Sequence, residues 1–152
     1  MRILCLDIGS KRIGLAASDP MGLIAQGIGV IERRGGGRDF DEIMRHAREL
    51  EATLILVGLP LDEEGGIGPQ AAKVEAFTAR LKGAMEAAGL DTPVEMWDER
   101  FSTATAEQRL IEADVSRKRR REVIDKMAAV AILQDYLDSR GDRLEGGEGF
   151  LG

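Results

Sequence analysis

RILCLDIGSKRIGLAASDPMGLIAQGIGVI, residues 2–31, contains three short apolar runs separated by two turns. The runs cover residues 2–7, 13–18 and 24–31. Apolar runs of this length, bounded by Gly, Pro and Asp, are typical of buried β-strands. Because the turns are short, we expect consecutive strands to pair antiparallel and to form a meander.

Helix-like and strand-like segments alternate through the rest of the 152 residues. We expect strands at 53–58 and 93–97, and helices at 39–50, 69–88, 102–113 and 116–139. This order predicts an α/β layer fold with a mixed sheet. We expect residues 1–139 to form a single domain, and the Gly-rich and acidic residues 140–152 to form a flexible tail.

Composition excludes several classes of protein. The chain has one cysteine, Cys5, and one histidine, His46, which excludes an internal disulfide and zinc sites built from Cys and His. No apolar run approaches the roughly 18 residues that a membrane span needs, and the start of the chain lacks a cleavable signal pattern. We therefore expect a cytoplasmic protein with no membrane partner, in which any bound metal is held by carboxylates.

Two acidic positions follow apolar strands. Asp7 ends the first run, and burying a carboxylate costs several kcal/mol unless a partner such as a metal ion compensates it. The alternative is an Asx-turn made by the same side chain. Asp98 and Glu99 follow the strand 93–97, and because adjacent residues point to opposite sides, one of them should face a site. The alternative there is a solvated acidic turn paired internally with Arg100.

A third acid lies in the last helix. At 100° per residue, Asp125 shares a helix face with Ala128, Ala129, Ile132 and Tyr136. The small alanines would let this helix lie close to the sheet and would bring Asp125 towards the strand ends. A plain ion pair, with Lys126 or with a basic residue upstream, is the alternative.

Three converging carboxylates would suit a metal site. Oxygen ligands favour Mg²⁺ or Mn²⁺, and two such ions can activate water and stabilise the leaving oxygen in phosphoryl displacement. No Ser-His-Asp or Cys-His arrangement competes, because Cys5 is expected in the core and His46 on a helix surface. Trp97 is expected to pack against the core or a sheet face, without a functional role.

The charge distribution permits a polyanionic partner. The formal charge is −6, but six cations stand against two acids between Ser116 and Lys126. Most belong to the run Arg117, Lys118, Arg119, Arg120 and Arg121. Such a run is often only a solvated helix face, but next to a metal carboxylate it favours binding of nucleic-acid phosphates.

Four blocks of sequence together resemble the YqgF/RuvX family. They are LDIGSKRIGLAASD (6–19), VGLPLDEEGG (57–66), WDERFSTATAE (97–107) and IDKMAAVAILQDYL (124–137). The resemblance covers about residues 2–139 and implies an RNase H-like fold, with a mixed five-stranded sheet of three antiparallel and then parallel strands, flanked by helices. Members of the family are regarded as Holliday junction resolvases or as nucleases that mature the 5′ end of pre-16S rRNA.

The resemblance also implies roles for single residues. Asp7, Asp125 and one residue of the pair Asp98 and Glu99 would bind divalent metal, and the longer reach of Glu99 favours it over Asp98. The phosphate contacts implied are Arg12, Arg100, Ser102 and Thr103. Unlike most RNase H-like resolvases, the family has no acid directly after the fourth strand, and here the first acids after VGLP are Asp62 to Glu64.

The expected function is therefore that of a nuclease dependent on Mg²⁺ or Mn²⁺, acting on structured nucleic acid, with pre-rRNA favoured over branched DNA. A ribosomal particle is a further expected partner. The alternatives are a Holliday junction resolvase, which would need a two-fold dimer, and a non-catalytic RNA-binding factor of ribosome assembly. A kinase module of the actin–hexokinase kind is disfavoured by length, because that fold needs two such domains.

Overall fold

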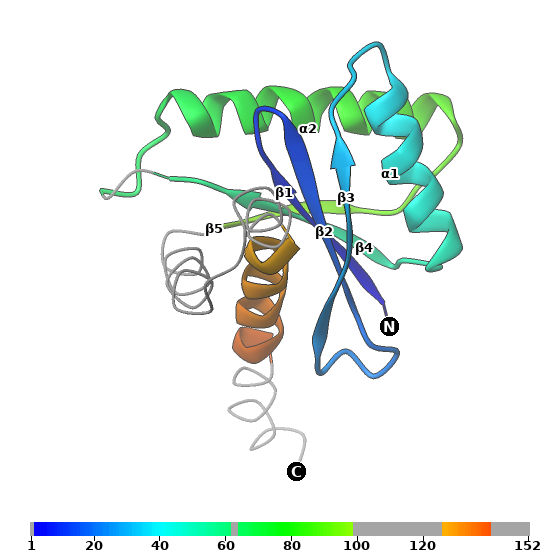
Figure 1. Cartoon of the computed structure of the whole chain (residues 1–152), viewed down its shortest axis with the longest axis vertical. Helices are drawn as coiled ribbons and strands as arrows, with labels where there is room; N and C mark the ends of the chain where they lie inside the picture. Colours follow the sequence, from blue (N-terminus) through cyan, green and yellow to red (C-terminus); the bar gives the residue numbers. More distant parts are fainter. Residues whose placement is uncertain (1, 62–63, 99–125, 141–152) are drawn as a thin grey trace, which may run out of the picture.

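The computed structural model describes residues 2–61, 64–98 and 126–140, which fold around one five-stranded sheet (Figure 1). The strand order is β3-β2-β1-β4-β5, with β1–β2 and β2–β3 antiparallel and β1–β4 and β4–β5 parallel. The strands are β1 (Ile3–Ile8), β2 (Arg12–Ser18), β3 (Ala25–Glu32), β4 (Leu54–Leu59) and β5 (Val94–Asp98). The expected antiparallel meander and mixed sheet are confirmed.

Among the described residues, three helical segments accompany the sheet: α1 (Arg38–Glu49), α2 (Pro69–Ala87) and residues 126–140. The ends of α2 carry residues that commonly begin and end helices. Pro69 is its first residue, and Gly89, at φ +75°, follows the residue that caps its C-terminal end. The helix expected at 102–113, the start of the one expected at 116–139 and most of the tail expected at 140–152 lie outside the described residues. Among the helices that are described, none combines the length and apolarity needed to cross a bilayer.

The sheet is covered on both faces, and each face has its own core. On one face, Leu4, Leu6 and Ile8 pack with α1 and α2. On the other, Ile3 and Cys5 pack with the helix 126–140, which Figure 1 shows on the side opposite α1 and α2. Cys5, the single cysteine of the chain, is fully buried, as expected of a small core residue. Strand alternation thus defines a helical-pair face and a single-helix face of the sheet.

Trp97 identifies the residues of β5 that belong to the single-helix face. Its ring meets Tyr136 edge-on at 5.1 Å between centroids, and its Nε1 donates to Asp135 at 2.8 Å. Glu95, two residues earlier, lies 3.5 Å from the Tyr136 hydroxyl. The expectation that Trp97 packs on a sheet face is confirmed. Val94 packs against the core on the helical-pair face, so the side chains of β5 alternate regularly between the two faces.

Candidate functional site

Asp7 lies one residue before the end of β1, half-buried on the single-helix face. It shares that face with Cys5, because residues two apart on a strand point the same way. Its cross-strand partner in β2 is Gly14. On the other side, β1 pairs with β4, and Leu6 is opposite Val57. The next pair in this register is Asp7 with Gly58. The position directly opposite Asp7 on each neighbouring strand is therefore a glycine.

Arg12 begins β2 on the same face as Asp7. Asp7 pairs with Gly14, and Arg12 lies two residues before Gly14, so Asp7 and Arg12 are diagonal neighbours across the antiparallel pair. Such neighbours are about 7–8 Å apart, which long side chains can span. The turn between them is closed by the amide of Gly9, which donates to the Arg12 carbonyl at 2.8 Å. The structure thus brings together the first acid and the first cation that the sequence singled out.

Asp98, by contrast, lies on the opposite face of the sheet. It is the last residue of β5 and pairs with Leu59 of β4. Since Glu95 and Trp97 face the helix 126–140, alternation puts Asp98 with Val94 on the helical-pair face. Asp7 lies near the end of β1 and Asp98 at the end of β5, but the two carboxylates lie on opposite faces of the sheet. Glu99, Arg100, Ser102 and Thr103 lie outside the described residues.

The helix 126–140 runs along β3 towards the start of that strand, since Lys126 lies beside Gly27 and Gln134 bonds to Ala25 and Leu23. A Cβ on Gly27 of β3 would meet the Lys126 side chain at 2.4 Å, so the missing side chain there leaves room for the lysine stem. Further along, Gln134 accepts from the Ala25 amide at 2.9 Å and donates to the Leu23 carbonyl at 3.1 Å. The expected stripe is confirmed as the sheet-facing side, because its four members are buried: Ala128, Ala129, Ile132 and Tyr136.

The remaining acidic and basic candidates lie outside the described chain. These are Asp125 and the run Arg117, Lys118, Arg119, Arg120 and Arg121. Within residues 2–61, 64–98 and 126–140, no three acidic, Cys or His side chains come together as a metal-binding group. His46 is half-buried on α1, and that burial lowers the pKa of its imidazole.

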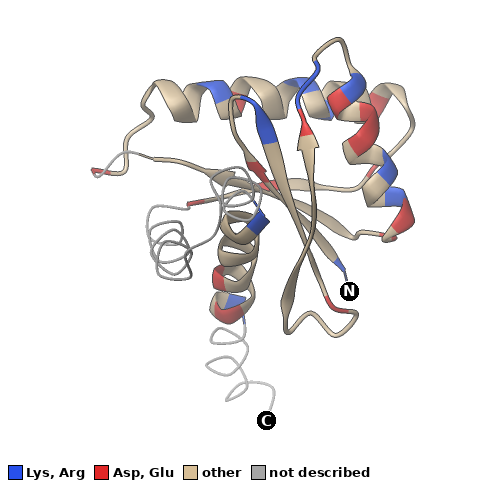
Figure 2. Cartoon of the chain, in the orientation of Figure 1, with Lys and Arg blue, Asp and Glu red and all other residues tan. Residues whose placement is uncertain are grey.

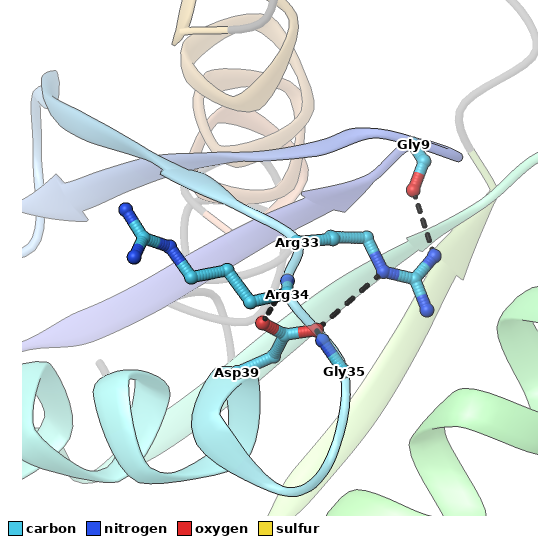
Figure 3. Close-up of polar contacts among 5 residues, drawn as sticks. All are labelled: Gly9, Arg33, Arg34, Gly35 and Asp39. Atoms are coloured by element: carbon cyan, nitrogen blue, oxygen red, sulfur yellow. Dashed lines mark hydrogen bonds and ion pairs between the residues drawn. The ribbon is translucent and has the colours of Figure 1, made fainter.

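One polar arrangement was not foreseen from the sequence: the loop between β3 and α1 is tied to the β1–β2 turn (Figure 3). Asp39, only 5% exposed, accepts from the Arg34 amide at 2.9 Å and the Gly35 amide at 3.4 Å. Arg33 lies with its Nε 3.8 Å from the same carboxylate, and its Nη1 donates to the Gly9 carbonyl at 2.9 Å. The only sequence signal was the composition of the loop, two arginines followed by three glycines.

Comparison with known proteins gives this geometry a context. The family model described as "RuvX: Holliday junction resolvase" matches residues 1–139. A protein of Pelotomaculum thermopropionicum named "Putative pre-16S rRNA nuclease" is 51% identical over 142 residues, covering 93% of this chain and 89% of that protein. A protein of the same name from Syntrophomonas wolfei is 48% identical, over 91% of this chain and 94% of its own length.

Solved structures agree on the fold. Thermus thermophilus RuvC, in complex with a Holliday junction substrate, has a TM-score of 0.57 at 18% identity, over 92% of this chain and 96% of that chain. The fowlpox virus resolvase, in complex with Holliday junction DNA, has a TM-score of 0.55 at 11% identity, over 91% and 98%. At these identities the likeness concerns the fold alone, and it confirms the expected RNase H-like architecture. Taken with the match over residues 1–139, these findings show that the chain belongs to the RuvX family.

Proposed function

We propose that this protein is a divalent-metal-dependent nuclease that hydrolyses phosphodiester bonds in structured RNA, with the precursor of 16S rRNA as its substrate. The observation that carries the proposal is the placement of Asp7: a half-buried carboxylate near a strand end, between two glycine positions, with Arg12 on the same sheet face. Relatives 43–51% identical to this chain are named for action on pre-16S rRNA.

The proposed carboxylates are Asp7, Glu99 and Asp125. Strand alternation supports Glu99 over Asp98, because the residue after Asp98 is the next in step with Glu95 and Trp97, which both face the helix 126–140. Helix periodicity supports Asp125, which stands four residues before the fully buried Ala129. On this assignment Asp98 has a supporting role on the other face.

The donor set fits Mg²⁺ or Mn²⁺. All three proposed ligands offer carboxylate oxygen, while Cys5 is enclosed in the core and His46 lies on α1. When bound, such an ion supplies activation of water and stabilisation of the charge that develops on the leaving oxygen. The chain itself orients the substrate: Arg12 holds a phosphate beside Asp7, with Arg100, Ser102 and Thr103 as further phosphate contacts. The cationic run 117–121 binds the backbone.

A Holliday junction resolvase is the second candidate function. It is favoured by the description of the matching family model and by the likeness to resolvases whose structures contain junction DNA. A resolvase cuts two strands symmetrically and would require a two-fold dimer of this chain. The acidic overall charge, −6, makes generic duplex-DNA binding less favourable than binding of one structured RNA.

Cleavage of two labelled substrates by the full chain tests the proposal. One is an RNA that spans the 5′ leader and the start of 16S rRNA, and the other is a four-way DNA junction, each with Mg²⁺, with Mn²⁺ and with EDTA. We expect the RNA to be cut only when a metal is present and the junction to be cut much more slowly. Preferred junction cutting would favour the resolvase. RNA binding without metal-dependent cutting would favour a non-catalytic assembly factor.

A further inference from the structure

A small pocket lies where the β1–β2 turn meets the first turns of α2. Seven residues line it: Ile8, Gly9, Ser10, Arg33, Gln70, Lys73 and Val74. Two are cationic and none is acidic. The pocket has a volume of about 30 Å³, enough for one or two phosphate oxygens but far too small for a nucleobase.

The guanidinium of Arg33 is held in place at this pocket. Its Nη1 donates to the Gly9 carbonyl at 2.9 Å, and Asp39 lies 3.8 Å from its Nε (Figure 3). Its Cζ also lies 4.9 Å from the centre of the Phe77 ring on α2. These contacts fix the side chain while leaving it 30% exposed, so its remaining N–H groups can meet a ligand with little further loss of rotamer entropy.

Lys73 supplies the second cation from the other side of the pocket. It is exposed on α2 and, among the residues that the structure describes, forms no ion pair with an acid. The helix begins at Pro69 after Gly68, with no side-chain cap and no acid in its first turn. The partial positive charge of that helix end therefore adds to the charge of Lys73 and Arg33.

The segments that meet at the pocket contain further cations, although the chain as a whole is acidic. Figure 2 shows basic residues on the β1–β2 turn, on the loop after β3 and along α2. Lys11 lies in the turn and Arg12 begins β2, while Arg34 follows Arg33 in the loop and Arg38 begins α1. The backbone joins these two segments, because the Arg33 amide donates to the Lys11 carbonyl at 2.8 Å.

The pocket is adjacent to the candidate catalytic residue but on the other side of the turn. Two of its lining residues, Ile8 and Gly9, follow Asp7 directly in the chain. We propose that this pocket binds a backbone phosphate of the nucleic-acid substrate at a distance from the bond that is cut, with Arg33 and Lys73 as its ligands. The proposal rests on the proposed function, since it assigns the substrate of that site a second point of attachment.

The test is binding of the RNA leader substrate by the full chain in EDTA, so that no cleavage occurs, across a range of salt concentrations. The informative variant is Lys73→Glu. Lys82→Glu is the matched control, because Lys82 is also an exposed lysine of α2 but lines a different pocket near the end of the helix. We expect Lys73→Glu to raise the Kd about ten-fold or more and to reduce the slope of log K against log salt by about one. Lys82→Glu should bind like the wild type.

A second series locates the phosphate. One backbone phosphate at a time is replaced by a neutral methylphosphonate, and one position should weaken binding to the wild type but not to Lys73→Gln. A third set of measurements adds inorganic phosphate at matched ionic strength, to test whether the pocket binds a free anion. We expect inorganic phosphate to compete only weakly with the RNA. Unchanged affinity and salt slope in Lys73→Glu would overturn the inference even if the RNA is cleaved. Loss of affinity in a protein that never cleaves would uphold the pocket and refute the nuclease.

Discussion

At the scale of single residues, glycine neighbours and strand alternation shape the candidate site. Gly14 pairs with Asp7, and the continued register brings Gly58 to its other side, so both positions directly opposite the carboxylate are glycines. The same alternation separates Asp98 from Asp7, although both residues stand near strand ends. The two neighbouring acids 98 and 99 therefore should not be interchangeable.

The first prediction compares Asp98→Asn with Glu99→Gln. Both changes remove a charge and keep the shape of the side chain. Loss of a metal ligand should lower the cleavage rate at least about 100-fold, the upper range seen for residues that support metal ligands. We expect Glu99→Gln to show that loss and Asp98→Asn to keep most of its activity, measured as single-turnover rates. The reverse pattern would assign the site to Asp98.

The second prediction concerns Asp39, which organises the loop between β3 and α1. Asp39→Ala leaves the amides of Arg34 and Gly35 without their acceptor and removes the anion beside Arg33. Hydrogen bonds to a charged group contribute about 1.5–3 kcal/mol, so we expect the free energy of unfolding in urea to fall by about that amount. Asp41→Ala, an exposed acid in the same first helical turn, is the control and should change it by less than about 1 kcal/mol. Equal effects of the two changes would argue against this role for Asp39.

At the scale of elements, the helix 126–140 depends on small residues where it meets the sheet. Ala129 is fully buried in the core that also contains Cys5 and Ala16. Overfilling such a position costs about 1–3 kcal/mol. We expect Ala129→Leu to be destabilised by that amount and to lose cleavage activity as well, because the helix would be pushed away from the sheet face that carries Asp7.

The matched control for this change is Ala131→Leu, which adds the same volume at a half-exposed position of the same helix. Unfolding curves and single-turnover cleavage should both stay close to the wild type there. A destabilised Ala129→Leu that cleaves at the normal rate would show that the seating of this helix does not position the site.

Most elements could be predicted from the sequence because apolar runs and turn residues define them locally. The strand predicted at 53–58 is found at Leu54–Leu59, and the helix predicted from Pro69 ends at Ala87. The link from Arg33 to Gly9 could not be predicted, because it joins residues 24 apart and depends on how the loop packs against the turn. The sheet face on which Asp98 lies could not be predicted either, because the sequence indicates only that one of two adjacent acids faces a site. The contact of Trp97 with Asp135 is what assigns that face.

At the scale of the whole molecule, the two faces of the sheet contribute different parts of one proposed binding surface. The single-helix face carries Asp7 and Arg12. The helical-pair face carries the pocket with Arg33 and Lys73. Both sets of residues meet at the β1–β2 turn, so a nucleic-acid backbone that passes over this turn would contact both. Concentrating cations there lets a chain of net charge −6 bind a polyanion.

The most direct test of the account is a single-turnover cleavage assay that compares the wild type with Asp7→Asn on the pre-16S leader RNA, with Mg²⁺ or Mn²⁺. Asp91→Asn, a change at an exposed acid before β5, serves as the control. We predict that Asp7→Asn still folds and binds the RNA but cleaves at least about 100-fold more slowly, while Asp91→Asn cleaves normally. Cleavage by Asp7→Asn at the wild-type rate would contradict the account, because the activity would then not depend on the carboxylate around which the site is built.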